Sequence, residues 1–170
     1  MNEIVSILQG DITQQSVDAI VNAANTRLCG GGGVDGAIHR YAGPELLKEC
    51  LSVGGCPTGE ARITQGYNLP AKWIIHTAGP IWRGGGAHEE ELLARCYQSC
   101  FNLAEGKNIR SIAFPSISTG AYRFPLERAT YIALRETMNF LESKVLVKKI
   151  IFVCFDEKTF SCYKRIEKEM

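Results

Sequence analysis

The sequence predicts an α/β domain in which helices cover both faces of a mostly parallel β-sheet. Apolar segments of strand length alternate with segments whose apolar residues recur at helical spacing. Most connections between the expected strands are too long for hairpins, which favours parallel pairing through helical crossovers. No repeat, linker or low-complexity stretch interrupts the 170 residues, so we expect one domain spanning residues 1–170.

The amino-terminal half is expected to hold four strands and two short helices. The first apolar run stops at Gly10-Asp11, a polar turn, and Gly43-Pro44 is a break signal that divides the two helices. The strands are expected at residues 4–8, 19–22, 60–69 and 72–80, the last two joined by a turn, and the helices at 36–43 and 44–53.

The carboxyl-terminal half alternates helices and strands. The segment 84–106 has acids in its first turn, where the helix dipole favours negative charge, and apolar residues at helical spacing. A proline near the first turn starts a second helix, and Asp156 is a good N-cap for a third. We expect helices at 84–106, 124–143 and 156–169, and strands at 109–118 and 147–155.

Composition excludes several classes of partner. The formal net charge of +1 creates no overall attraction to nucleic acid or to an anionic membrane. No apolar run reaches the roughly 18 residues that span a bilayer, and the amino terminus lacks a secretory signal. Seven cysteines without a CxxC pair are typical of buried thiols in a reducing compartment. We therefore expect a cytoplasmic protein with no metal site.

Two glycine-rich loops are candidate phosphate sites. The stretch "CGGGGVDGAIH" (29–39) brings bare backbone amides to the start of an expected helix, where the dipole attracts anions. The stretch "PSISTGAYRFP" (115–125) offers hydroxyls and amides after a buried strand. The first does not directly follow a strand, as a dinucleotide fingerprint would. Taken alone, the first stretch also fits a flexible surface loop and the second a plain strand-to-helix turn, but together they indicate a diphosphate.

Other polar residues at strand ends are suited to the two nucleoside parts of such a ligand. The carboxyl ends of parallel strands meet in one crevice, and these residues lie at or just after the ends of expected strands. Asp11 is able to accept a hydrogen bond from an exocyclic amine such as that of adenine, Phe155 to stack on a base, and Asn22 and Asn25 to bind ribose hydroxyls. Taken singly, each also fits a structural role: Asp11 in a turn, Phe155 in the core, and the asparagines in turns or caps.

Five motifs together resemble the macrodomain family over nearly the whole chain: "GDIT", "VNAAN", "LCGGGGVDGAIHRYAG", "TQGYNLPAKWIIHTAGPIW" and "FPSISTGAYRFP". The likeness is greatest to the MacroD-type subgroup, which contains bacterial O-acetyl-ADP-ribose deacetylases. It implies a three-layer α/β/α fold around a central mixed, mostly parallel sheet, with an ADP-ribose site. It also implies hydrolysis of an acyl ester on the distal ribose, from O-acetyl-ADP-ribose or from mono-ADP-ribosylated acidic side chains of proteins.

The resemblance assigns residues to each part of the ligand. Asp11, Ile12 and Phe155 are expected at the adenine, Asn25 and Asp35 at the distal ribose, and the two glycine-rich loops around the diphosphate. The candidate binding residues are Asp11, Ile12, Asn22, Asn25, Gly32, Gly33, Val34, Asp35, Gly36, Ser118, Thr119, Gly120, Ala121, Tyr122, Phe155 and Asp156.

The candidate catalytic residues are Asp35, Asn25 and His39, with no cofactor. Asp35 is the best candidate to orient or activate water. His39 lies four residues later, on the same helix face, although a structural role fits it equally, and His76 in "KWIIHTAG" is expected in the core. Two other functions stay open: a reader that binds ADP-ribose without cleavage, and a single-stranded RNA binder. Low net charge and the lack of a basic, aromatic face argue against nucleic acid.

Two residues depart from the subgroup's pattern. Arg123 stands where the subgroup usually has glycine, so it either pairs with a phosphate or points outward and stiffens its loop. Tyr41 replaces a residue that is usually small. Both substitutions bear on substrate preference more than on the fold.

Overall fold

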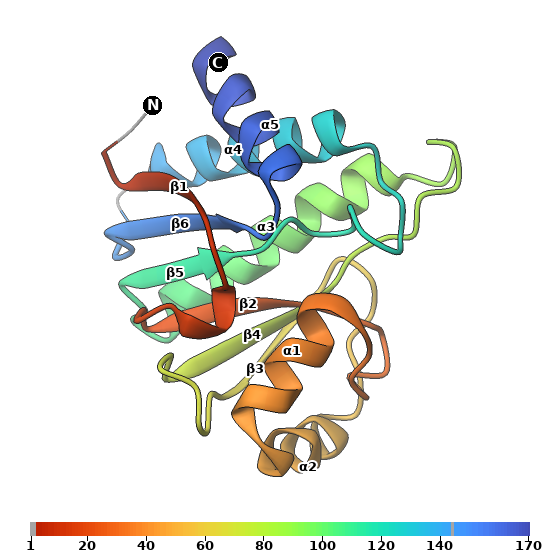
Figure 1. The fold of residues 1–170 in the computed structure, drawn as a ribbon, viewed down its shortest axis with the longest axis vertical. Coiled ribbons are helices and arrows are strands. Elements are labelled where there is room, and N and C mark those ends of the chain that lie inside the picture. Colours follow the sequence, from red (N-terminus) through yellow and green to blue (C-terminus); the bar gives the residue numbers. More distant parts are fainter. Residues whose placement is uncertain (1–2, 144) are drawn as a thin grey trace.

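The computed structural model describes residues 3–143 and 145–170, and its described strands form one mixed sheet (Figure 1). The order across the sheet is β1-β6-β5-β2-β4-β3, and every neighbouring pair is parallel except β3 and β4. The strands are β1 (Val5–Gln9), β2 (Ala19–Ala24), β3 (Ala61–Gln65), β4 (Trp73–Ala78), β5 (Ser111–Phe114) and β6 (Lys149–Cys154).

Helices cover both faces of this sheet, which makes three layers. α1 (Gly33–Ala42) and α2 (Pro44–Val53) pack on one face. α3 (Glu89–Gly106), α4 (Leu126–Leu141) and α5 (Glu157–Glu169) pack on the other. The alternation of side chains along a strand separates the two cores. In β2, Val21 joins the core under α3–α5, whereas Ile20 joins the core under α1 and α2.

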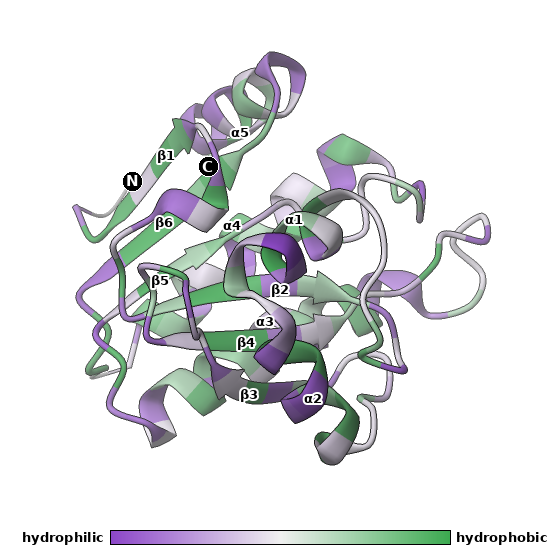
Figure 2. Cartoon of the chain, turned by 60° about the horizontal axis from the view of Figure 1, so that its bottom comes forward, coloured by the Kyte–Doolittle hydropathy of each residue, from purple (hydrophilic) through white to green (hydrophobic). Residues whose placement is uncertain are grey.

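Aromatic rings fill the core under α3–α5. Phe114 of β5 lies 5.2 Å from Tyr97 and 5.1 Å from Phe101, both on α3, and 5.7 Å from Phe152 of β6, measured between ring centroids. Figure 2 shows hydrophobic residues running along the strands, β4 and β6 among them. The loops at the ends of the strands therefore extend from a sheet that is packed on both faces.

The predicted α/β class, the helices on both faces and the mixed, mostly parallel sheet are confirmed. Several boundaries were set too wide: α3 begins at Glu89 because a glycine-rich loop precedes it, and β5 ends at Phe114. A short 3-10 helix, η1 (Ile12–Gln14), was not predicted. Three residues are too few to show a periodicity, although Asp11 is the kind of residue that caps such a turn.

Candidate ligand-binding and catalytic site

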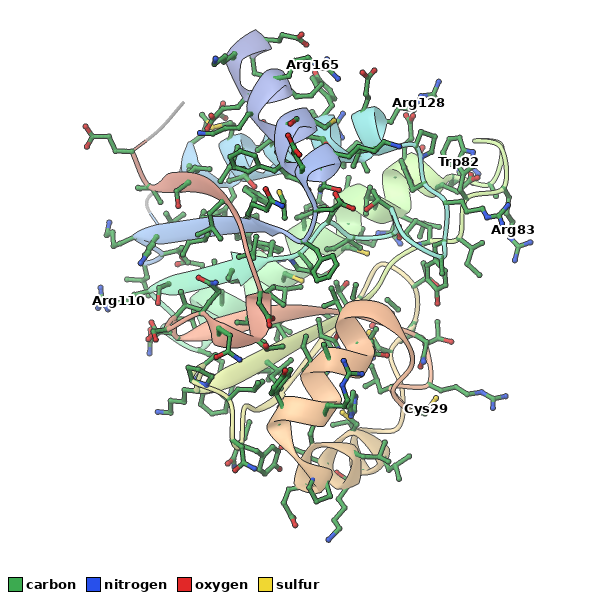
Figure 3. The ribbon with its side chains drawn as sticks, in the orientation of Figure 1. Cys29, Trp82, Arg83, Arg110, Arg128 and Arg165 are labelled. Atoms are coloured by element: carbon green, nitrogen blue, oxygen red, sulfur yellow. The ribbon has the colours of Figure 1, made fainter. Side chains whose placement is uncertain are left out.

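A hollow of about 320 Å³ opens at the carboxyl ends of β2, β4 and β5. Figure 3 shows Cys29, before α1, and Arg83, after β4, on the same side of the molecule, with Arg110, which precedes β5, on the opposite side. The hollow is thus at the edge where parallel α/β sheets bind ligands. Its lining residues are Ala23, Ala24, Asn25, Gly31, Gly32, Gly33, Val34, Asp35, Gly79, Ser116, Ile117, Ser118, Gly120, Ala121 and Tyr122.

One wall of the hollow is the first turn of α1. Gly32 is the N-cap, and the first helical hydrogen bond runs from the N–H of Gly36 to the carbonyl oxygen of Gly32 (3.1 Å). The preceding N–H groups of the helix have no intrahelical acceptor, so they are free to bind an anion. A Cβ added at Gly32 or Gly33 would meet nothing within 4 Å. The bare backbone there leaves space for a ligand to approach the amides closely.

Asn25 holds the glycine loop in place. Its Nδ2 donates to the carbonyl oxygen of Gly30 (2.9 Å), and its Oδ1 accepts from the N–H of Cys29 (3.3 Å). Gly30 has a φ of +82°, a conformation that glycine adopts at little cost. The side chain that the sequence assigns to the distal ribose therefore also shapes the loop.

The opposite wall is the loop after β5. Ser118 has a φ of +66°, which is strained for a residue with a side chain. Its buried Oγ has no hydrogen-bond partner among the described residues. The Oγ atoms of Ser116 and Thr119 lie 2.6 Å apart, and the N–H of Phe124 donates to the carbonyl oxygen of Ser118 (2.9 Å). Strain of this kind is concentrated at ligand sites, and here it lies in the predicted second phosphate loop.

Asp35 is the acid of the hollow, and it is only 6% exposed. Its Oδ1 accepts from Nδ2 of Asn22 (2.9 Å) and lies 3.4 Å from Nε2 of His39. Its Oδ2 makes no hydrogen bond to the described residues and lies 3.2 Å from where a Cβ on Gly31 would stand. Burial raises the pKa of this carboxyl above 3.8, although the hydrogen bond from Asn22 and the nearby His39 act to lower it.

Asn22 and His39 support Asp35 and do not line the hollow. Asn22 is fully buried within β2, and His39 shares a face of α1 with Asp35, as its spacing predicts. Gly36 lies just behind the wall: a Cβ there would stand 2.4 Å from the carbonyl oxygen of Gly31. Of the three predicted catalytic residues, Asp35 and Asn25 line the hollow. His39 does not line it, but its Nε2 lies beside Oδ1 of Asp35.

The residues predicted for the adenine lie outside this hollow, at the ends of the neighbouring strands β1 and β6. Asp11 Oδ1 accepts from the N–H of Thr13 (2.9 Å) and caps η1, and Ile12 is buried. Phe155 is 81% exposed, so the alternative of a core role for it is wrong. Asp156 caps α5 by accepting from the N–H of Thr159 (2.8 Å), and this bond lowers its pKa.

Gly79, which follows β4 and lines the hollow, was not predicted from the sequence. A Cβ there would lie 2.2 Å from Oγ of Ser118, so only glycine lets the two loops meet. The sequence did contain a sign of this role, because Gly79 is a small residue at the carboxyl end of a parallel strand, where α/β sheets bind ligands. Gly31, Ser116 and Ile117 were also absent from the candidate list.

A second hollow, of about 240 Å³, adjoins the first and shares Gly79 and Tyr122 with it. Its far wall is the loop before α3, which the buried carboxylate of Glu89 holds by accepting from the N–H groups of Arg83 (2.8 Å), Gly85 (2.9 Å) and Ala87 (2.6 Å). Burial acts to raise the pKa of Glu89, but backbone N–H donors outweigh it and lower the pKa to about 2. This role of Glu89 was not predicted, because the N–H groups that it accepts from belong to an irregular loop.

The two departures from the subgroup's pattern fall in different places. Arg123 is exposed and has a φ of +60°, a backbone region that favours glycine. The positive φ of the turn before Phe124 thus explains why the subgroup usually has glycine at this position. Tyr41 is 53% exposed on α1 and does not line the hollow.

Within the described residues, no group of three or more His, Cys, Asp or Glu side chains is arranged to hold a metal ion. None of the helices built from these residues combines the length and the apolar character needed to cross a bilayer.

Comparison with known proteins identifies relatives along the whole chain. The family model described as "Macro domain" matches residues 21–133. The protein is 52% identical to an O-acetyl-ADP-ribose deacetylase of Salmonella gallinarum over 170 residues, covering 98% of this chain and 95% of the relative. It is 56% identical to a macro domain-containing protein of Mesorhizobium japonicum over 161 residues, covering 95% of this chain and 92% of the relative.

Solved structures agree with these relatives. An Oceanobacillus iheyensis macrodomain mutant with ADPR superposes with a TM-score of 0.91 at 46% identity, covering 96% of this chain and 91% of the other. A Trypanosoma brucei macrodomain in complex with ADP-ribose gives a TM-score of 0.91 at 47% identity, covering 96% and 69% of the two chains. The fold, the motifs and these matches together show that the chain belongs to the macrodomain family.

Proposed function

We propose that this protein is an ADP-ribose-binding hydrolase that removes acyl groups esterified to the distal ribose. Its substrates are O-acetyl-ADP-ribose and proteins mono-ADP-ribosylated on aspartate or glutamate. Relatives named O-acetyl-ADP-ribose deacetylase and macrodomain structures that hold ADP-ribose support this assignment. The observation that carries it is Asp35, a buried carboxylate with Oδ1 held by Asn22 and Oδ2 free beside Gly31 at the hollow.

Backbone amides bind the diphosphate in this proposal. The free N–H groups at the start of α1 and the loop 118–122 face each other across the hollow. Preorganised amides bind phosphate oxygens without the help of cationic side chains. Phe155 and Asp11, at the ends of β6 and β1, receive the adenine, and Asn25 and Asp35 receive the distal ribose.

Asp35 orients the attacking water. Oδ2 accepts a hydrogen bond from the water, which adds to the acyl carbonyl carbon while the carboxylate takes up its proton. The bond between the carbonyl carbon and the ribose oxygen then breaks, the ribose oxygen takes from the Asp35 carboxyl the proton that came from the water, and a carboxylic acid and ADP-ribose leave with Asp35 again a carboxylate. A base of this kind contributes about 10²–10⁴-fold to the rate, and the amides supply positioning and charge stabilisation.

The test is to incubate the protein with O-acetyl-ADP-ribose and with glutamate-linked mono-ADP-ribosylated protein, and to follow release of ADP-ribose. We expect turnover of both substrates, and Asp35→Ala to lose most of it while the Kd for ADP-ribose stays within roughly tenfold, about 1.4 kcal/mol. Binding without turnover by the unaltered protein would make it a reader instead. Equal activity of the variant and the unaltered protein would remove Asp35 from the mechanism.

A further inference from the structure

His76 is a buried imidazole to which the proposed hydrolysis gives no role. It lies on β4 directly beside Asn22 of β2 in the sheet register, and both residues are 0% exposed. Nδ1 of His76 is 3.1 Å from Nδ2 of Asn22, and Nε2 is 2.8 Å from Oγ1 of Thr64 on β3. The imidazole thus connects three adjacent strands behind Asp35.

The neighbours of the ring determine where its proton resides. The hydroxyl of Thr64 has one proton, and the carbonyl oxygen of Gln65, 3.2 Å away, is an acceptor for it; when that bond forms, the Thr64 oxygen is left to accept from Nε2–H of His76. Cys50 Sγ, 3.9 Å from Nε2, is the other polar atom near that nitrogen. Burial lowers the pKa of His76 to about 3, with a further contribution from the charge of His39. The low pKa keeps the ring neutral, and with its proton on Nε2 the ring has its lone pair on Nδ1.

The lone pair on Nδ1 in turn sets the orientation of the Asn22 amide. Nδ2 has two protons, and it has two acceptors in reach: Nδ1 of His76 and Oδ1 of Asp35 at 2.9 Å. The buried Oδ1 of Asn22 has no partner among the described residues. Rotating the amide by 180° would turn this oxygen towards a carboxylate and a lone pair, which are both acceptors, so the observed orientation is favoured despite the unpaired oxygen.

We propose that His76 is a positioning residue: its Nδ1 holds the Asn22 amide with an N–H towards Asp35, and so keeps Oδ2 of Asp35 directed at the hollow. Thr64 completes this chain by selecting the tautomer of His76. The inference rests on the proposed function of Asp35, but the contacts that carry it, from Thr64 through His76 and Asn22, are separate from those that bind the ligand.

Thr64→Val tests the chain with little change in volume, because it removes only the hydroxyl: the acceptor for Nε2–H of His76 and the donor to the carbonyl oxygen of Gln65. We expect kcat on O-acetyl-ADP-ribose to fall between about 10- and 100-fold, as misplacement of a catalytic group does, with KM and the Kd for ADP-ribose unchanged. Thr137→Val is the matched control: Thr137 is a buried threonine of α4, on the other face of the sheet, whose hydroxyl donates to the carbonyl oxygen of Ala133. Its kcat should not change.

His76→Asn and His76→Leu give an independent comparison. An asparagine carbonyl oxygen near the position of Nδ1 is able to accept from Asn22, whereas leucine offers no acceptor, so the asparagine variant should keep the higher kcat. Equal losses of kcat in the two variants, or equal losses in kcat and ligand affinity, would indicate that His76 serves only the packing of the sheet.

Nitrogen-15 NMR of the imidazoles supplies a readout that needs no activity, and the chain has only three histidines to assign. We expect His76 to be neutral at pH 7 with its proton on Nε2, and a proton on Nδ1 would overturn the proposal even if no variant folds. Absence of ADP-ribose release by the unaltered protein would defeat the proposed function itself, and full activity of Asp35→Asn would remove Asp35 from the mechanism. An inactive Asp35→Asn beside fully active Thr64→Val and His76→Leu variants would defeat only this inference.

Discussion

The burial of Asp35 lowers the stability of the folded protein at neutral pH, although the proposed reaction needs this carboxylate. Burial raises its pKa above 3.8, so the folded state holds the proton more tightly than the unfolded chain does. The folded state then binds more protons between pH 3.8 and the raised pKa, and stability falls as the pH rises through this window. At neutral pH the buried charge is a cost that the fold accepts for the sake of the site.

Asp35→Asn removes this charge and keeps the shape. We expect a higher melting temperature than that of the unaltered protein at pH 7, a difference that shrinks as the pH falls through the raised pKa towards 3.8, and a loss of turnover of about 10²-fold or more. Thermal melts across pH and an assay of ADP-ribose release measure the two effects. A variant less stable than the parent at pH 7 would show that the contacts of Asp35 outweigh its burial.

At the scale of elements, the first turn of α1 uses its glycines in two different ways. Gly32 faces open space, whereas Gly36 is pressed against the carbonyl oxygen of Gly31. The missing side chain at Gly32 leaves space for the ligand. The missing side chain at Gly36 lets the loop at Gly31 pass close to the helix.

The pair Gly32→Ala and Gly36→Ala separates these roles. Gly32→Ala should leave the free energy of unfolding within about 1 kcal/mol but raise the Kd for ADP-ribose tenfold or more, about 1.4 kcal/mol. Gly36→Ala should lower the free energy of unfolding by about 1–3 kcal/mol, because the backbone contact outweighs the helix preference of alanine of about 1 kcal/mol. Urea unfolding and calorimetric titration measure both quantities, and the reverse pattern would contradict this division.

The loop before α3 depends on one carboxylate. The pKa of Glu89 is lowered from 4.5 to about 2, so its contribution to stability is present above pH 4.5 and is lost as the pH falls towards 2. Glu89→Gln places an amide N–H₂ opposite a backbone N–H, so the melting temperature of the variant should be lower than that of the unaltered protein at pH 7. The two melting temperatures should converge near pH 2, where Glu89 itself becomes protonated. Glu91→Gln, at an exposed position two residues on, is the control and should show no such convergence.

At the scale of the whole molecule, the ring cluster around Phe114 ties the central strands to α3. Truncation of a buried ring costs about 3–5 kcal/mol, a large share of the 5–15 kcal/mol that stabilise a typical domain. We expect Phe114→Ala to lower the unfolding free energy by that amount in urea titrations. Phe155→Ala, at an exposed ring, should change it by less than about 0.5 kcal/mol. Similar losses in both would mean that Phe155 packs in solution.

Local pattern was enough to predict most of the fold and the two loops of the candidate site. Strand and helix periods, the break at Gly43-Pro44 and the N-cap at Asp156 depend on neighbours within a few residues, so they can be read along the chain. The glycine run and Asp35 likewise lie in one short motif. The resemblance to the macrodomain family then identified the expected ligand of these loops as ADP-ribose.

Only the tertiary structure placed Gly79 against Ser118, and Thr64, His76 and Asn22 in one chain behind Asp35. These residues lie on, or in the loops just after, four strands of the sheet. Their contacts depend on which strands pair and in what register, because a shift of one residue would turn the side chains of a strand to the other face. By itself, the sequence determined the order of the elements and the chemistry of the loops. The register of the sheet decided which buried groups meet, since side chains distant in the chain come within hydrogen-bonding distance only after the strands have paired.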